Sequence, residues 1–83
     1  MDYKVLIRLF VPELDEVYEL YIPINKYVGD ICESLCKIVN DLSKDYPLKK
    51  DVELCNRRTG VIYQKNHTIR QTDIRNGTEL VIF

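Results

Sequence analysis

The stretch Ile74-Arg75-Asn76-Gly77-Thr78-Glu79-Leu80-Val81-Ile82-Phe83 decides the fold of this chain. From residue 78 onward it alternates, with Leu80 and Ile82 on one face and Val81 and Phe83 on the other, which is the period of a β-strand. Asn76-Gly77 just before it is a strong turn signal, because both residues tolerate a positive φ. The sequence therefore predicts a last strand that is entered through a tight turn, and we expect no tail beyond it through which another protein could be attached.

Two more alternating stretches lie near the N-terminus, at residues 3 to 11 and 17 to 23. The connection between them contains Pro12, which cannot donate a hydrogen bond to a strand ladder. These stretches predict an antiparallel hairpin. The hydrophobic period then changes to steps of three and four residues between Val28 and Ser43, which predicts an amphipathic helix. Its apolar stripe is expected to consist of Val28, Ile31, Leu35, Ile38, Val39 and Leu42.

Short strands are expected at residues 51 to 55 and 61 to 63, with a turn between them. In the polar stretch that follows, Ile69 and Ile74 are expected to return to the core. If the helix is a crossover, the first and last strands lie side by side and parallel in the middle of the sheet. The expected fold class is therefore α+β, a β-grasp in which a mixed sheet of four to five strands packs on one α-helix, in a single domain over residues 1–83.

Composition narrows the possible functions. The chain has 83 residues, of which 46% are hydrophobic and 30% charged, as in a small globular domain. A net charge of −1 argues against nucleic acid as the main partner. No apolar run approaches the ~20 residues that span a bilayer, and a strand pattern follows Met1 almost at once, so we expect neither membrane insertion nor a signal peptide. Three cysteines, an odd number, indicate reduced thiols in the cytoplasm.

Over nearly its whole length the sequence resembles ubiquitin-like proteins. The resemblance rests on the element order and on the closing segment, in which Thr68-Ile69 and Asp73-Ile74 precede Asn76-Gly77-Thr78-Glu79-Leu80. The run from Ile74 to Leu80 is also similar to the ending of the small bacterial YukD/EsaB family, which is encoded with type VII (WXG100-type) secretion systems of Gram-positive bacteria. The resemblance implies a ubiquitin-like fold and a cytoplasmic accessory or regulator of such a system, which binds protein partners, secretion components among them, without covalent transfer.

The sequence departs from conjugating ubiquitin and from the sulfur carriers at its C-terminus. Both carry Gly-Gly there, whereas this sequence ends at Phe83. We therefore expect no conjugation and no thiocarboxylate, although a natural chain that continued to Gly-Gly would restore the alternative of a modifier or sulfur carrier. Another alternative is a self-associating structural module that pairs through residues 61 to 63 or through an apolar face, so a monomer and a weak homodimer both remain open.

No constellation of residues indicates an enzyme, a metal site or a cofactor site. Cys32 and Cys36 are one helical turn apart and could present two thiolates to a metal, but Cys32 borders the apolar stripe, where a free cysteine acts as a small apolar residue. His67 has no nucleophile or acid beside it in the sequence and is expected to serve a turn or a cap. We expect no catalytic, metal-binding or cofactor-binding residues.

The candidate binding residues lie on the sheet face that the helix leaves uncovered. Because neighbours in a strand point to opposite faces, the residues between the core positions must point there. The expected protein-binding residues are Leu6, Arg8, Phe10, Cys55, Arg57, Val81 and Phe83. We expect an apolar patch with Tyr21 nearby and arginines, including Arg58, at its rim, the same face with which ubiquitin-like domains dock partners. The alternative is that these side chains are simply favoured in strands.

Charged residues cluster in two parts of the sequence. Bases gather near the third strand and acids near the first hairpin, which predicts a basic end and an acidic end that could steer a partner. The bases are Lys49, Lys50, Arg57 and Arg58, and the acids are Glu13, Asp15, Glu16 and Glu19. The alternative is an ordinary solvated surface of mixed charge.

Overall fold

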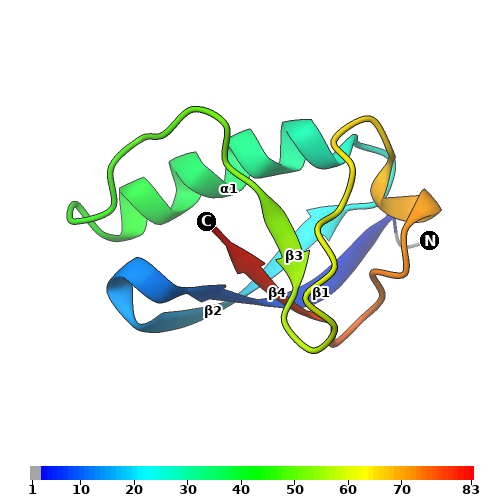
Figure 1. Cartoon of the computed structure of the whole chain (residues 1–83), viewed down its shortest axis with the longest axis horizontal. Coiled ribbons are helices and arrows are strands. Elements are labelled where there is room, and N and C mark those ends of the chain that lie inside the picture. Colours follow the sequence, from blue (N-terminus) through cyan, green and yellow to red (C-terminus); the bar gives the residue numbers. More distant parts are fainter. Residues whose placement is uncertain (1–2) are drawn as a thin grey trace.

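In the computed structural model, which describes residues 3–83, one helix crosses one face of a four-stranded sheet (Figure 1). The elements are β1 (Lys4–Val11), η1 (Pro12–Leu14), β2 (Glu16–Pro23), α1 (Val28–Leu42), β3 (Leu54–Asn56), η2 (Ile69–Gln71) and β4 (Glu79–Ile82), where η marks a short 3-10 helix. The strands are ordered β2-β1-β4-β3. The expected α+β fold, a mixed sheet packed on one helix, is confirmed.

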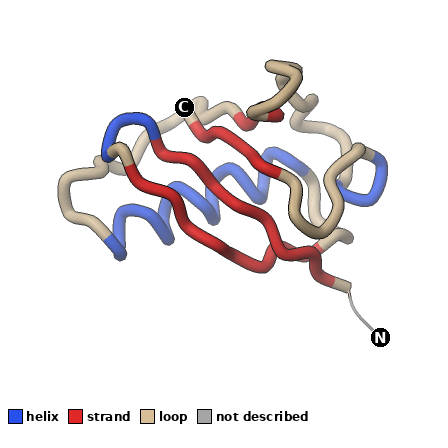
Figure 2. Tube along the Cα trace, turned by 90° about the horizontal axis from the view of Figure 1, so that it is seen from below, coloured by secondary structure: helices blue, strands red, loops and turns tan. Residues whose placement is uncertain are grey.

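The first and last strands lie side by side and parallel in the middle of the sheet, as the sequence predicts. β1 pairs with β4 in parallel, with Arg8 opposite Glu79, while β2 and β3 add antiparallel strands on the two sides. Figure 2 looks onto the sheet with α1 behind it. This order follows from the crossover through α1, which carries the chain from one edge of the sheet to the other.

The Asn-Gly turn connects the start of β4 to β1 through hydrogen bonds. Gly77 has a φ of 88°, a left-handed conformation that favours glycine. Its N–H donates to the carbonyl of Leu6 at 2.8 Å, and the Leu6 N–H donates to Asn76 Oδ1, also at 2.8 Å. The predicted turn is therefore confirmed, and it fixes the register of the parallel pair.

The lengths predicted for the two short strands after the helix are wrong. Asp51 has a φ of 58°, which breaks the extended backbone, so only Leu54–Asn56 forms a strand. The segment 61–63 forms no strand and joins the sheet through one isolated bridge, Cys55 to Ile62. The pairing of β3 with β4 continues for one residue before Leu54, where Glu53 and Phe83 exchange two backbone hydrogen bonds of 2.8 and 3.0 Å.

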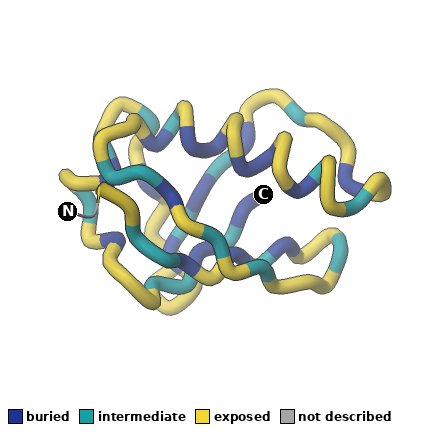
Figure 3. Tube along the Cα trace, turned by 180° about the vertical axis from the view of Figure 1, so that it is seen from behind, coloured by how far each residue is buried: buried dark blue, intermediate teal, exposed yellow. Residues whose placement is uncertain are grey.

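The helix has the predicted start and length, but its buried stripe is rotated. Cys32 and Cys36 are 3% and 2% exposed, whereas Ile38 and Leu42, which the pattern assigns to the core, are 39% and 57% exposed. The segment that follows α1 covers the cysteine side of the helix, where the Lys49 N–H donates to Cys36 Sγ at 3.3 Å. A thiol packs there as a small, largely apolar group. In Figure 3 the buried positions of the helix and the strands lie between the two layers.

Ile69 and Ile74 are fully buried, so the expected return of these two residues to the core is confirmed. None of the helices within residues 3–83 is long and apolar enough to cross a membrane.

Candidate protein-binding face

The face of the sheet opposite α1, here called the outer face, follows from the alternation of β1. Ile7 and Leu9 are fully buried toward the helix. Leu6, Arg8 and Phe10, which lie between or beside them, must therefore point outward and are exposed or half-buried. The expected orientation of the three β1 residues is confirmed.

One line of outward side chains crosses the whole sheet and is apolar. The register aligns Val17, Phe10, Val81, Cys55 and Ile62 in this line, here called the apolar row. The ends of the row, Val17 and Ile62, are 40% and 52% exposed, and the three residues between them are half-buried. Phe83, 47% exposed, lies two residues beyond Val81. The apolar row offers a partner a nearly continuous hydrophobic strip.

The neighbouring line of side chains is charged and is here called the ionic row: Glu19, Arg8, Glu79 and Arg57. Arg8 lies 4.0 Å from Glu19 and 3.7 Å from Glu79, and Arg57 lies 3.6 Å from the other oxygen of Glu79. Cross-strand pairs of opposite charge stabilise a sheet modestly, and exposed pairs contribute about 0–1 kcal/mol each. The ionic row mainly fixes the positions of the two arginines.

Arg57 covers the centre of the apolar row. Its guanidinium carbon lies 3.9 Å from the centroid of the Phe10 ring, a cation–π contact that reaches diagonally across β4. Beside it a hollow of about 270 Å³ opens between Phe10, Val17 and Val81, with Glu16 among its other lining residues. A partner can therefore reach an apolar floor between a base and an acid.

The structure brings together most of the residues that the sequence predicts for protein binding. Phe10, Cys55, Arg57 and Val81 form one cluster, and Arg8 borders it. Leu6 does not join them as expected.

Leu6 lies beyond the ionic row, opposite Tyr21, which is 68% exposed. The reason is the register, which places Arg8 and Glu79 between Leu6 and Val81. Arg58 lies in the turn after β3, outside both rows, where its backbone N–H donates to Asn56 Oδ1.

Four residues of the two rows are missing from the predicted binding residues: Val17, Glu19, Glu79 and Ile62. The hairpin register could have identified Val17, because it lies opposite Phe10. The alternation of the last strand could have identified Glu79, two residues before Val81. No local pattern indicates the bridge of Ile62 to Cys55.

The expected division into a basic end and an acidic end is wrong. Lys49 forms an ion pair with Glu13, so members of the two clusters lie against each other. Arg57 is likewise paired with Glu79. The chain returns from the end of α1 past η1, and this return brings residue 49 next to residue 13.

Two of the three thiols, those of Cys32 and Cys55, have a raised pKa, which favours the protonated form. Burial raises the pKa of Cys32 to about 11 and also raises the pKa of Cys55. Within residues 3–83, no group of three or more His, Cys, Asp or Glu residues is placed to hold a metal ion.

The carbonyl of His67 accepts the first N–H of the helix, from Val28, at 2.7 Å, so its predicted turn or capping role is confirmed through the backbone.

No protein-family model matches this sequence, and no curated protein matches it. Solved structures are similar in fold. A chain of the MycP5-free ESX-5 inner membrane complex is 19% identical with a TM-score of 0.84, and the match covers 99% of this chain but 21% of that one. The ubiquitin-like domain of the type VII secretion protein EccD1 from Mycobacterium tuberculosis is 9% identical over 99% of this chain and 98% of that one, with a TM-score of 0.76.

Ubiquitin from Caldiarchaeum subterraneum is 18% identical over 95% of this chain and 90% of that one, with a TM-score of 0.70. Identities this low show the fold alone. The class of the molecule is nevertheless plain: it has the ubiquitin-like β-grasp fold, and its structural neighbours include domains of type VII secretion components.

Proposed function

We propose that this chain is a non-catalytic ubiquitin-like interaction module that binds protein partners reversibly through the outer face. The observation that carries the proposal is the apolar row, which crosses all four strands and is exposed at both ends. A strip of this kind, bordered by polar residues, is typical of a protein-binding surface. Binding would remove it from water.

The ionic row gives this surface its specificity. Glu79 lies between Arg8 and Arg57 and holds both guanidinium groups in place on the face. Charges at the border of an interface set orientation and exclude wrong partners more than they add affinity. A partner with an apolar centre and an acidic border would match this arrangement, because each arginine keeps donors free for a second carboxylate.

We infer further that the module is a cytoplasmic accessory or regulator of a type VII (WXG100-type) secretion system. The similar folds of the EccD1 domain and of a chain in the ESX-5 inner membrane complex support this assignment. The resemblance of the closing segment to the YukD/EsaB family supports it independently. The partners would then be secretion components.

The test is affinity capture from the native cell with quantification of type VII secretion components. Val81→Glu places a charge in the apolar row, and we expect it to abolish capture. Leu6→Glu is the matched control, because it places the same charge on the same face but beyond the ionic row, and it should retain capture. Circular dichroism confirms that both variants are folded. Equal capture by wild type and Val81→Glu would refute the outer face as the binding surface.

A further inference from the structure

The outer edge of β2 carries backbone groups that no strand of residues 3–83 satisfies. Leu6 and Arg8 direct their backbone N–H and C=O groups toward β4 and its entry turn. The residues opposite them in the antiparallel hairpin, Tyr21 and Glu19, therefore direct theirs away from β1, as does Val17. β2 is the terminal strand of the sheet, so these groups line a free edge.

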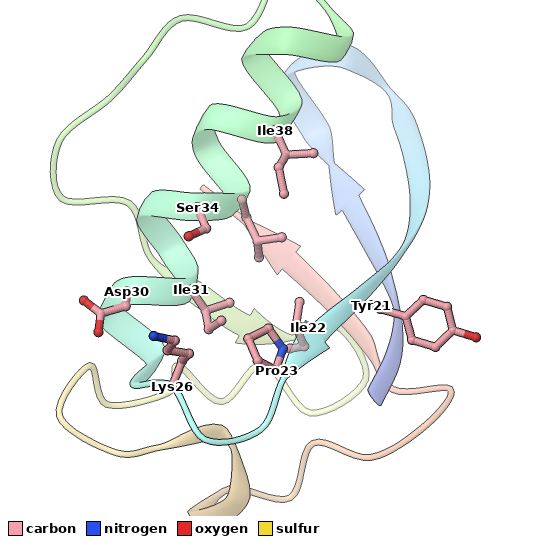
Figure 4. A pocket seen from close by; sticks show the side chains of 9 residues that line it. Tyr21, Ile22, Pro23, Lys26, Asp30, Ile31, Ser34 and Ile38 are labelled. Carbon is pink, nitrogen blue, oxygen red and sulfur yellow. The ribbon is translucent and has the colours of Figure 1, made fainter. Parts of the chain in front are cut away.

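An apolar groove runs beside this edge, between β2 and α1. Its volume is about 210 Å³, and Ile22, Ile31, Leu35 and Ile38 contribute to its lining. Figure 4 shows Ile31 and Ile38 extending from the helix toward β2, while Tyr21 points away from the groove. Ile38 is 39% exposed, and Leu42, one turn further along the helix, is 57% exposed. The rotation of the buried stripe thus leaves aliphatic side chains uncovered next to an unpaired strand.

The charges along the edge favour a basic occupant. β2 contains two acids, Glu16 and Glu19, and no base, and Asp15 immediately precedes it. Asp30 lines the groove with Lys26, so the groove itself is neutral. Arg8 pairs with Glu19 at 4.0 Å, whereas neither Asp15 nor Glu16 makes an ion pair within the described part of the chain.

The same charges disfavour a second copy of this chain at the edge. The antiparallel self-pairing with the greatest overlap places Val17 of one copy opposite Tyr21 of the other. This register sets Glu19 directly opposite itself, and like charges in that position destabilise a strand pair. An acidic edge strand is a common device against such pairing.

We propose that the groove between β2 and α1 binds an extended segment of a partner protein that carries aliphatic residues at alternate positions and lysine or arginine near Asp15 and Glu16. The segment adds a fifth strand and takes its main-chain hydrogen bonds from Val17, Glu19 and Tyr21. Its alternate side chains enter the groove against Ile38. This site does not depend on the outer face, because it uses the strand edge and the helix.

The test is a titration of ¹⁵N-labelled protein, followed by NMR, with three synthetic peptides. The first alternates valine with threonine and carries lysine at both ends. The second has glutamate in place of lysine, and the third has proline in place of the central threonine. We expect saturable shifts at the amides of Val17, Glu19, Tyr21 and Ile38 with the first peptide, binding about tenfold weaker with the second, and none with the third, because proline removes a ladder donor. Absence of saturable binding by the first peptide would overturn the proposal.

Substitutions in the protein locate the site. Ile38→Lys should abolish binding of the lysine peptide, and Ile38→Ser, which is less disruptive, should weaken it. Val61→Lys is the matched control, since Val61 is 58% exposed and its segment adjoins the opposite edge of the sheet. Val81→Glu should also bind the lysine peptide normally, so that loss of binding at the groove can be distinguished from loss of binding at the outer face. Unchanged binding by Ile38→Lys, loss with Val81→Glu, or a dimer that forms through β2 on concentration would each overturn the proposal.

Discussion

Two buried tyrosines differ in whether their hydroxyl groups are satisfied. Tyr63 donates to Asp73 Oδ1 at 2.6 Å and accepts from the Asn56 side chain at 3.1 Å, and so joins the loop after β3 to the loop before β4. The Tyr46 hydroxyl, in a fully buried residue, makes no regular hydrogen bond among residues 3–83 and has the weakly polar Cys36 thiol beside it. Burial without a partner costs free energy, whereas a satisfied hydroxyl contributes about 0.5–1.5 kcal/mol.

We therefore expect Tyr63→Phe to lower the free energy of unfolding by about 1–2 kcal/mol, because it leaves Asp73 and Asn56 without their partner. Tyr46→Phe should leave that free energy unchanged or raise it, since the hydroxyl that it removes makes no hydrogen bond within the described part of the chain. Urea denaturation of both variants measures the difference. Equal losses would show that the hydroxyl of Tyr46 is satisfied in solution.

The pKa of Tyr63 predicts that the free energy of unfolding depends on pH. Burial, and next the hydrogen bond to Asp73, raise the pKa of Tyr63 from 10.0 to about 12. The folded state thus retains this proton at pH values where the unfolded state has released it. Its contribution to stability is complete below pH 10 and is lost as the pH rises from 10 to about 12. Unfolding free energies measured across this range should fall less steeply for Tyr63→Phe than for wild type.

The three thiols should differ in reactivity. Cys55 is half-buried on the outer face, whereas Cys32 and Cys36 lie in the core. Burial also raises the pKa of Cys32 to about 11, which suppresses its thiolate. We expect iodoacetamide to add one group to the folded protein, at Cys55, and three to the unfolded protein, as read from intact mass. A native protein alkylated on the helix as rapidly as on Cys55 would contradict the buried position of the helical thiols.

At the scale of elements, the start of α1 lacks a side-chain cap. Tyr27 occupies the N-cap position in an extended conformation and makes no capping hydrogen bond. Carbonyls of the loop before η2 replace the cap, because His67 and Lys65 accept the N–H groups of Val28 and Gly29. The start of the helix therefore depends on tertiary contacts.

A cap at this position should strengthen the helix. We expect Tyr27→Asp to raise the free energy of unfolding by about 0.5–1 kcal/mol, through a hydrogen bond to the first turn and the favourable helix dipole. Tyr27 is 52% exposed, so little packing is lost. Tyr27→Ala, which cannot cap, is the control and should show no gain in thermal unfolding. Similar midpoints for the two variants would mean that the loop already satisfies the first turn.

Local patterns predicted the elements whose periodicity extends over many residues. The hairpin, the helix and the closing turn and strand all have such patterns, and all are confirmed. Residues 61–63 alternate over too short a stretch, and they pair with β3 only around the isolated bridge of Ile62 to Cys55 within the described part of the chain. Asp51 adopts a positive φ that alternation cannot reveal.

At the scale of the whole molecule, the sequence predicts which residues point to the outer face but not how they are arranged on it. Alternation identifies Phe10 and Val81 as outward residues. The long-range register of β1 and β4 decides that Arg8 and Glu79 separate Leu6 from Val81. The path of a long side chain such as Arg57, which crosses β4 to reach Phe10, depends on three strands at once and has no sequence signal.

How far the buried stripe extends along α1 can be tested with two of its leucines, of which Leu42 is the last residue of the helix. The helical period assigns Leu35 and Leu42 to the same stripe, yet Leu35 is 1% exposed and Leu42 is 57% exposed. Leu35→Ala should lower the free energy of unfolding by about 3 kcal/mol, because it opens a cavity between the two layers of the core. Leu42→Ala should lower it by about 0.5 kcal/mol or less, since a surface substitution removes little packing.

For a domain whose total stability is about 5–15 kcal/mol, urea denaturation resolves this difference easily. Both variants should keep the denaturant slope of the wild type, which shows that the same surface is exposed on unfolding. Comparable losses at the two positions would place Leu42 in the core and extend the buried stripe to the last residue of α1.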